Sequence, residues 1–298
     1  MKKFALLVGN GFTLDFIDSH NLDIHSSFPL KNFNSLEINY QHFIDKLSHI
    51  QNELLGNDLD DYKMIERYAS KHTIGSIQEG QLRQFLALSY SLFQLKLDNY
   101  EFPEWKWAQW LQQNKEYLCC AISFNYDLVL ERALKSVNIP YSRTGSDESA
   151  RNVPVLKPHG SIDFDFPFGV LPSPYLVNLF THLNDAGLVE ILPKWEWLLY
   201  RREADIIPPS VHNYQKKLQW VQTIFNTYES KSKQLDALII VGSSYWYVDR
   251  PEINFFLEKL PKTAIVYICS PDPDRDLVNK ILSLGLTYKP FGFNELPW

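Results

Sequence analysis

The chain has 298 residues, with 29 Lys and Arg against 35 Asp and Glu, which gives a formal net charge of −6 with His neutral. Hydrophobic residues make up 45% and charged residues 21%. This composition is typical of a globular protein and excludes disordered, collagen-like and coiled-coil chains. Because the chain is acidic and has no block of Lys and Arg, it lacks the usual electrostatic source of nucleic-acid binding, and we expect no direct nucleic-acid partner.

The apolar runs and the cysteines indicate the cellular compartment of the protein. No run approaches the roughly 18 to 20 apolar residues that span a bilayer, and Asn10 ends the apolar start with no small-residue cleavage site after it. We expect a cytoplasmic protein with no membrane partner. The adjacent Cys119 and Cys120 and the distant Cys269 form neither a disulfide framework nor a C-x-x-C zinc pair. They predict three buried thiols.

Five short apolar runs predict buried strands. They cover residues 4–8, 118–124, 153–156, 237–241 and 264–269. Continuous runs rich in β-branched residues suit strands that are covered on both faces, as in a parallel sheet. We therefore predict an α/β fold, a Rossmann-like doubly wound parallel sheet, in a single domain over residues 1–298.

Two long stretches interrupt this pattern, at about 26–117 and 162–234, and we predict that they are helical insertions or a cap on the sheet. Residues that are nearly all apolar recur in them at three- and four-residue intervals, which is typical of helices. These residues are Leu82, Phe85, Leu86, Ser89 and Phe93, then Trp107, Trp110 and Leu111, and finally Leu218, Val221, Ile224, Phe225 and Tyr228. The aromatic-rich first stretch, with Trp105 as well, supplies either a partner surface or core packing.

The first candidate for binding is Gly9-Asn10-Gly11-Phe12-Thr13, directly after the first predicted strand. Glycines here allow a tight turn and a close approach of the backbone to a phosphate, and the following helix N-terminus offers N–H groups to an anion. A dehydrogenase fingerprint requires Gly at the position of Leu14, so hydride transfer is disfavoured. An ordinary strand-to-helix turn is the alternative interpretation.

Polar residues also follow the second and third strands. Asn125 and Asp127 lie where ligands bind in an open α/β sheet, although either residue can instead cap the helix that begins near Leu128. His159 stands between Pro158 and Gly160 after the third strand. A neutral imidazole, with a pKa of about 6.5, is suited to accept a proton from a sugar hydroxyl.

The last two strand ends complete the pattern. Gly242, Ser243 and Ser244 after the fourth strand can place a backbone turn and hydroxyls against a ribose or phosphate. Asp272 after the fifth strand either accepts hydrogen bonds from an adenosine ribose or caps a helix that starts at Pro273. Five strand ends of this kind predict a single nucleotide crevice.

Four segments, in this order, resemble motifs of the sirtuin-like family. They are residues 9–12 (GNGF), 123–134 (SFNYDLVLERAL), 159–163 (HGSID) and 239–244 (IIVGSS). Residues 207–210 (IPPS) are similar to a pocket-lining Pro-Pro segment of the bacterial anti-phage branch of that family. The opening GNGF also resembles abortive-infection proteins of the H type.

The resemblance implies NAD binding and assigns roles to the candidate residues. His159 matches the general base, and Asn125 and Asp127 match positions that face the nicotinamide and its ribose. The implied NAD-binding residues are Gly9, Asn10, Gly11, Phe12, Thr13, Asp15, Ser161, Gly242, Ser243, Ser244 and Asp272. Gly9 and Gly11 would lie under the pyrophosphate, and Asp15 would match an acidic residue after the glycine motif.

The chain departs from the family's protein deacylases, which carry a four-cysteine zinc module between the His-Gly and the later Gly-Ser motifs. This chain has no cysteine between Cys120 and Cys269, so we expect no zinc. The implied activity is then hydrolysis of NAD to nicotinamide and ADP-ribose by an anti-phage effector. Its expected control is assembly, as a homo-oligomer or with an ATPase or Argonaute-like partner. A protein deacylase and a non-catalytic NAD- or ADP-ribose-sensing module are the alternatives.

Overall fold

A seven-stranded parallel sheet forms the centre of the protein. The computed structural model describes residues 2–22, 61–72, 76–143, 152–167, 187–199, 201, 204–209, 218–270, 272–292 and 295–298. The strands of the sheet are β1 Phe4–Val8, β2 Leu118–Ser123, β3 Tyr141–Arg143, β4 Val153–Leu156, β7 Ala237–Val241, β8 Ile265–Cys269 and β9 Thr287–Phe291. Their order is β3-β4-β2-β1-β7-β8-β9, so the strand order reverses between β1 and β7.

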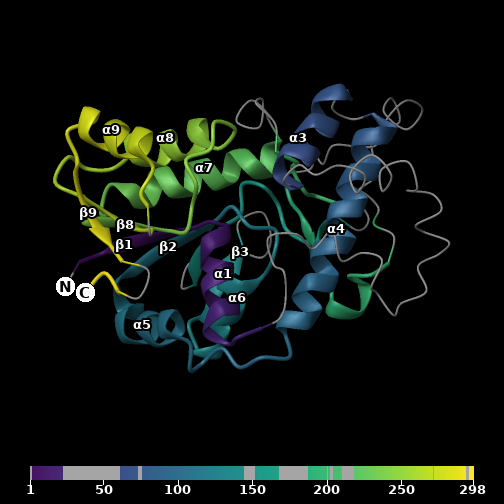
Figure 1. Cartoon of the computed structure of the whole chain (residues 1–298), viewed down its shortest axis with the longest axis horizontal. Helices are drawn as coiled ribbons and strands as arrows, with labels where there is room; N and C mark the ends of the chain where they lie inside the picture. The colour runs from purple at the N-terminus through teal and green to yellow at the C-terminus, as the bar shows by residue number, and fades with distance from the viewer. Residues whose placement is uncertain are drawn as a thin grey trace.

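Helices cover both faces of the sheet (Figure 1). The described helices are α1 Asn10–Ser19, α3 Asp61–Lys71, α4 Ile77–Leu97, α5 Lys106–Asn114, α6 Val129–Ser136, α7 Gln219–Ser232, α8 Arg250–Glu258 and α9 Arg275–Ser283. Phe4, Leu6 and Val8 of β1 pack with α1, α4, α5 and α6, whereas Ala5 and Leu7 pack with α7, α8 and α9. This two-faced burial confirms the doubly wound α/β fold. Among the described helices, none is both long and apolar enough to cross a membrane.

All five predicted strands are present, with β2 ending and β8 starting one residue inside the predicted bounds. The sequence did not reveal β3 or β9. β3 has three residues, and β9 is an edge strand that contains Lys289 and Pro290 and is largely exposed. Neither has the continuous apolar run on which the prediction depends, and an edge position tolerates proline.

The insertions are only partly as predicted. The expected spacings lie in α4, α5 and α7, but the second insertion also holds an antiparallel pair of strands, β5 Phe164–Asp165 and β6 Glu190–Ile191. Trp105, Trp107 and Trp110 keep 2% or less of their surface exposed and pack in the core. For these three residues the alternative of core packing is therefore correct and the partner-surface interpretation is wrong. Residues 26–60 of the first predicted insertion lie outside the described residues.

The three thiols lie on two strands of the sheet. Cys120 and Cys269 are buried, but Cys119 is only partly buried, which corrects the prediction for that residue. Burial raises the pKa of the Cys269 thiol to about 12 and also raises the pKa of Cys119. Thiols with such pKa values are protonated at neutral pH and react poorly as nucleophiles.

A fully buried lysine joins the loops that follow β2 and β4. Lys157 Nζ donates a hydrogen bond of 2.6 Å to the carbonyl oxygen of Asp127 and lies 3.2 Å from Glu131 Oε1. Beside this pair, the Arg143 guanidinium donates to both oxygens of Asp163 at 2.7 Å. An ammonium group without water must be fully paired, so Lys157 fixes the distance between the segments that carry Asp127 and His159.

Replacing Lys157 should therefore cost much of the protein's stability. Lys157→Met leaves Glu131 without its nearest cation and Asp127 without its carbonyl partner, and the expected loss is about 3–5 kcal/mol in the free energy of unfolding. Urea unfolding measures it. The control is Lys280→Met, which removes a partly exposed ion pair with Glu258 and should cost about 1 kcal/mol or less. Equal losses in the two variants would contradict this assignment.

Candidate functional site

A cavity of about 830 Å³ opens at the carboxyl ends of β1, β2, β7 and β8. It lies at the reversal of the strand order, which is where open α/β sheets bind ligands. Its size falls in the range of small-molecule and cofactor pockets. Leu14, Lys63 and Tyr90 also line it, so α1, α3 and α4 contribute to its wall. The structure thus brings the predicted strand ends together in one crevice.

The glycines after β1 and β7 let two backbone turns touch. A Cβ atom on Gly11 would lie 2.5 Å from Gly242 Cα, and a Cβ on Gly9 would lie 2.6 Å from Ser243 Cα. The Gly11 N–H donates to the Gly242 carbonyl at 2.8 Å. Gly242 has a φ of +57°, in the left-handed region that favours glycine. The contact between the two turns therefore requires these glycines, whether or not a phosphate binds beside them.

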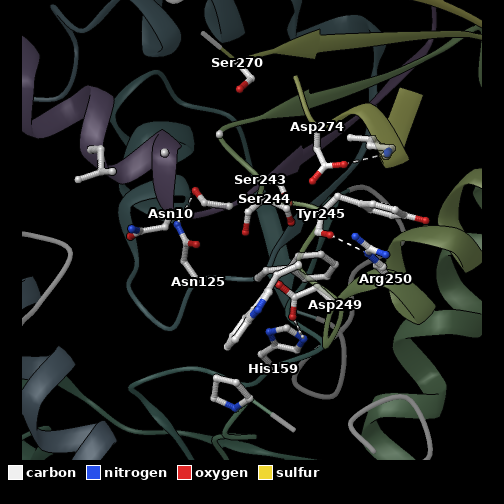
Figure 2. Close-up of a pocket in the computed structure, with 18 of the residues that line it drawn as sticks. Asn10, Asn125, His159, Ser243, Ser244, Tyr245, Asp249, Arg250, Ser270 and Asp274 are labelled. Carbon is white, nitrogen blue, oxygen red and sulfur yellow. Dashed lines mark hydrogen bonds and ion pairs between the residues drawn. The ribbon is translucent and has the colours of Figure 1, made fainter. Parts of the chain in front are cut away.

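Hydrogen bonds to the turn after β1 and to α1 fix the side chain of Asn125. Its side-chain Nδ2 donates to the Gly9 carbonyl and to Thr13 Oγ1, both at 3.0 Å. Its amide oxygen points into the pocket (Figure 2). Because both donor contacts involve the β1–α1 segment, the orientation of this amide depends on the same turn that meets Gly242.

Asp127 is buried next to Thr13, the residue that also contacts Asn125. Its carboxylate accepts hydrogen bonds from Thr13 Oγ1 at 2.9 Å and from the Val129 N–H at 3.1 Å. Burial raises the pKa of Asp127, and the nearby Lys157 ammonium and the two hydrogen bonds oppose that effect. The contact with Val129 gives Asp127 a local role at the start of α6, although Leu128 and not Asp127 holds the cap position there. Asp127 also lines the pocket.

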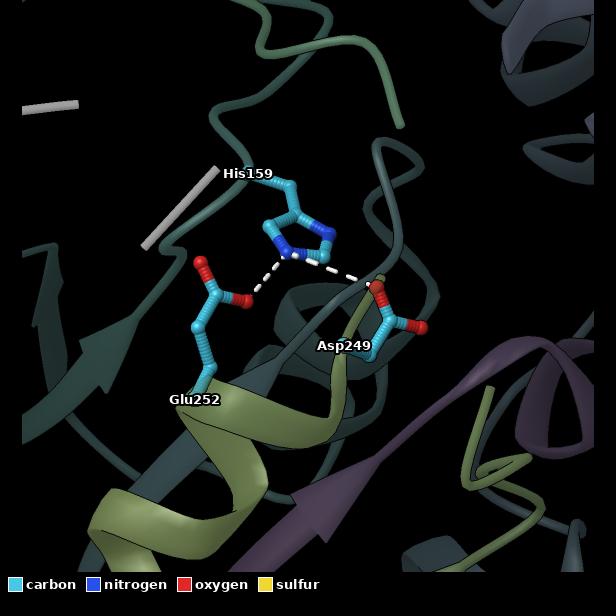
Figure 3. A group of neighbouring side chains, drawn as sticks. All are labelled: His159, Asp249 and Glu252. Carbon is cyan, nitrogen blue, oxygen red and sulfur yellow. Dashed lines mark hydrogen bonds and ion pairs between the residues drawn. The ribbon is translucent and has the colours of Figure 1, made fainter. Parts of the chain in front are cut away.

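His159 lies against two carboxylates and an aromatic ring. Its Nε2 is 2.5 Å from Glu252 Oε2 and 3.9 Å from Asp249 Oδ1 (Figure 3). The imidazole stacks on Phe124 with 4.8 Å between ring centroids and 14° between planes. The pKa of Asp249 is raised to about 6, mainly by burial, with His159 opposing the rise and Glu252 adding to it. The ring is thus fixed in both plane and direction.

The other predicted polar residues line the same pocket. Asn10 stands at the start of α1, and Ser243 and Ser244 follow β7 (Figure 2). Asp272 follows β8 and also lines the pocket. Ser244 and Asp272 are exposed. The predicted helix cap at Asp272 is wrong: α9 begins at Arg275, and its cap is Asp274, whose carboxylate accepts from the Asp276 and Leu277 N–H groups. That leaves Asp272 available to the pocket.

Four predicted residues point elsewhere. Phe12 packs edge-on against Trp105, and the Asp15 carboxylate bonds to Trp105 Nε1 at 2.8 Å and to Lys106 Nζ at 2.6 Å. Ser161 is buried against Tyr126, and Thr13 is buried under Asn125. On α1 the pocket face contains Gly11 and Leu14, so residues 12 and 15 face α5 instead. Direct contact of Phe12, Asp15 and Ser161 with a ligand in this pocket is therefore not supported.

Several residues of the site were missed from the sequence, and most lie just after β7. They are Tyr245, Trp246, Tyr247, Asp249, Arg250 and Glu252. Residues 249–252 read Asp-Arg-Pro-Glu, an N-cap, a proline and an acidic first turn, which is a helix-start signal. That signal predicts α8 but not the pairing of Glu252 with His159. Pro209, from the Pro-Pro segment, does line the pocket, and Ser210 lies outside the described residues.

Comparisons with known proteins find similar structures only. No protein-family model and no curated protein matches the sequence. A mutant Sir2 homologue in complex with 2′-O-acetyl-ADP-ribose is 12% identical, with 95% of this chain and 94% of that chain covered and a TM-score of 0.39. A mutant Sir2 homologue with ADP-ribose is 12% identical over 96% of this chain and 90% of that chain, with a TM-score of 0.40.

A Sir2 homologue in complex with NAD is also 12% identical, over 97% of this chain and 84% of that chain, with a TM-score of 0.35. Similarity at this level assigns no activity to the chain. Its function has to rest on its own residues.

The contact between the two turns can be tested with two glycines that share a positive φ. Gly242→Ala combines the left-handed backbone with a Cβ 2.4 Å from Gly11 Cα, whereas Gly285→Ala has a φ of +70° and open space around the Cβ. Gly285→Ala should cost about 1–2 kcal/mol in the free energy of unfolding. Gly242→Ala should cost clearly more in the same urea titration. Similar values would show that the turns do not pack as described.

The buried Asp249 carboxylate predicts a pH-dependent stability difference. Its pKa is about 6, against an ordinary value of 3.8, so the folded state disfavours the ionised form. Wild type should therefore lose stability as pH rises through this interval, whereas Asp249→Asn should not lose this contribution. Relative to wild type, the variant should gain roughly 1–3 kcal/mol between about pH 4 and pH 8. Thermal midpoints at the two pH values measure it, with Asp272→Asn as the exposed control; a difference that does not grow with pH would contradict the assignment.

Proposed function

We propose that this protein is an NAD hydrolase that cleaves the bond between nicotinamide and ribose and releases nicotinamide and ADP-ribose. The observation that carries the proposal is the meeting of Asn125 and His159 in one crevice at the reversal of the strand order, beside two glycine turns. Dinucleotides bind at such reversals in doubly wound sheets. The order of motifs that resembles the sirtuin-like family supports the same ligand.

The pyrophosphate would lie beside the turn of residues 9–11 and the start of α1, because the N-terminus of a helix attracts anions. The adenosine half would extend along Ser243 and Ser244, which lie next to each other in Figure 2, and toward Asp272, which also lines the pocket. The nicotinamide end would then face Asn125 and His159.

In the reaction, water attacks C1′ of the ribose as the C1′–N bond breaks, and the electron pair of that bond returns to the nicotinamide nitrogen. His159 accepts the proton that the attacking water loses. The Asn125 amide oxygen, which points into the pocket, orients the water or the ribose. The ribose gains positive charge in the transition state, and the buried carboxylate of Asp127 stabilises it through space while it also holds Thr13.

An NAD hydrolase that is always active would exhaust the NAD of its own cell, so we propose that assembly controls it. The controlled form would be a homo-oligomer or a complex with an ATPase or Argonaute-like sensor in anti-phage defence. Comparing nicotinamide release across a range of protein concentrations tests self-assembly, and adding candidate partners tests the complex. A rate per molecule that is constant under all of these conditions would contradict control by assembly.

The activity is tested by incubating the protein with NAD, alone and with an acetylated peptide, and quantifying the products. The proposal expects nicotinamide and ADP-ribose in equal amounts without peptide. O-acetyl-ADP-ribose that forms only with the peptide would identify a deacylase. Binding of NAD without any product would identify a sensing module. Either of these results would overturn the hydrolase proposal.

His159→Ala should lower the rate of nicotinamide release by about 10²- to 10⁴-fold, the usual contribution of a general base. The affinity for NAD should change little, since the imidazole acts on the water, and Asn125→Ala should also lower the rate. The control is His20→Ala, because His20 lies at the opposite end of α1 from the pocket. Full turnover by a folded His159→Ala protein would exclude His159 as the base.

A further inference from the structure

A buried glutamate makes the shortest contact of the proposed base. Glu252 lies in the first turn of α8 and keeps 1% of its surface exposed. Its Oε2 is 2.5 Å from His159 Nε2 (Figure 3). A carboxylate is costly to bury without a partner, so a buried glutamate aimed at an imidazole indicates a contact with a specific role.

The geometry distinguishes a hydrogen bond from a shared cation. The donor atoms of His159, Asp249 and Glu252 lie within 4.8 Å of one another, which by itself also suits a metal ion. Two ligands of one cation, each at about 2.0–2.2 Å, are typically about 3 Å or more apart. The contact between His159 Nε2 and Glu252 Oε2 is shorter than that, so it fits a direct hydrogen bond and leaves no room for a cation between the two atoms.

This hydrogen bond has a consequence for the tautomer of His159. An ionised carboxylate can only accept, so Nε2 carries the proton in the contact with Glu252. In a neutral imidazole that leaves Nδ1 as the nitrogen without a proton, and it is the atom able to act as a base. The stack on Phe124 holds the ring plane, so the hydrogen bond to Glu252 selects one of two ring orientations.

We propose that Glu252 is a positioning residue that holds His159 in its Nε2-protonated tautomer and so makes Nδ1 the proton-accepting atom of the site. Asp249, 3.9 Å from Nε2, is the second acidic group that faces the ring, from the loop before α8. The catalytic consequence rests on the hydrolase function proposed above, whereas the tautomer does not. Removal of a carboxylate that holds a catalytic imidazole in one tautomer slows catalysis strongly.

The direct test is a nitrogen NMR spectrum of protein with ¹⁵N-labelled histidine. The chain has eight histidines, and the His159 signals are those lost in His159→Ala. In wild type at the pH of activity, the expected pattern is a protonated Nε2 and an unprotonated Nδ1. In Glu252→Gln, whose amide can both donate and accept, the expected pattern shifts toward a mixture of the two tautomers. A wild-type ring protonated on Nδ1, or on both nitrogens, would overturn the proposal.

The kinetic test compares three variants. Glu252→Gln should lower kcat on the order of 10²-fold with little change in KM. Glu252→Asp, which keeps a carboxylate, should restore part of kcat and the wild-type tautomer. The control is Glu258→Gln, a change on the same helix at a residue that pairs with Lys280 on the surface. If Glu252→Gln does not fold, the NMR spectra of wild type and of Glu252→Asp still show which nitrogen of His159 carries the proton.

The outcomes separate this proposal from the hydrolase function. A wild-type protein that releases no nicotinamide, but whose His159 tautomer changes in Glu252→Gln, loses the proposed function and keeps the positioning role. A wild-type protein that turns over NAD, with Glu252→Gln unchanged in both tautomer and kcat, keeps the function and overturns the positioning role. Loss of the His159–Glu252 signature only after metal removal would also overturn it in favour of a cation site.

Discussion

The direct contact between the backbones of two turns fixes the two sides of the crevice relative to each other, and the rest of the site is built on it. Gly11 and Gly242 approach so closely that neither has room for a Cβ atom, and this contact joins the turn after β1 to the turn after β7. It falls where the strand order reverses, so the crevice forms between the two halves of the sheet. Asn125 takes its orientation from the first turn, and the loop that carries Asp249 follows the second.

Buried charged side chains behind the pocket hold the remaining groups of the site. Lys157 connects the segment of Asp127 to the segment of His159, and Glu252 connects His159 to α8. Each of these contacts lies where water is excluded, so each group depends on its partner and the loss of one side is costly. The polar groups that face the pocket are therefore supported by polar groups behind them. Such support keeps reactive side chains in one geometry, which catalysis requires.

The sequence predicts the central sheet and the crevice but not the finer contacts. Continuous apolar runs identify the five inner strands, whereas β9, with Lys289 and Pro290, has no such run. Spacing along α1 could not show that Asp15 faces α5, because that choice depends on an insertion that packs on one side of the helix. Glu252 is 93 residues from His159 in the sequence. Its presence there is already accounted for as an acidic residue in the first turn of a predicted helix, so nothing in the sequence indicates the pairing. Pairings of that kind follow only from the folded arrangement.

The most direct test of this account is a crystal structure of the His159→Ala variant soaked with NAD. We expect one NAD molecule across the crevice, with its pyrophosphate beside the turn of residues 9–11, its adenosine half along Ser243 and Ser244 and its nicotinamide ribose beside Asn125. NAD bound elsewhere on the molecule would contradict it. So would an empty crevice at a saturating NAD concentration.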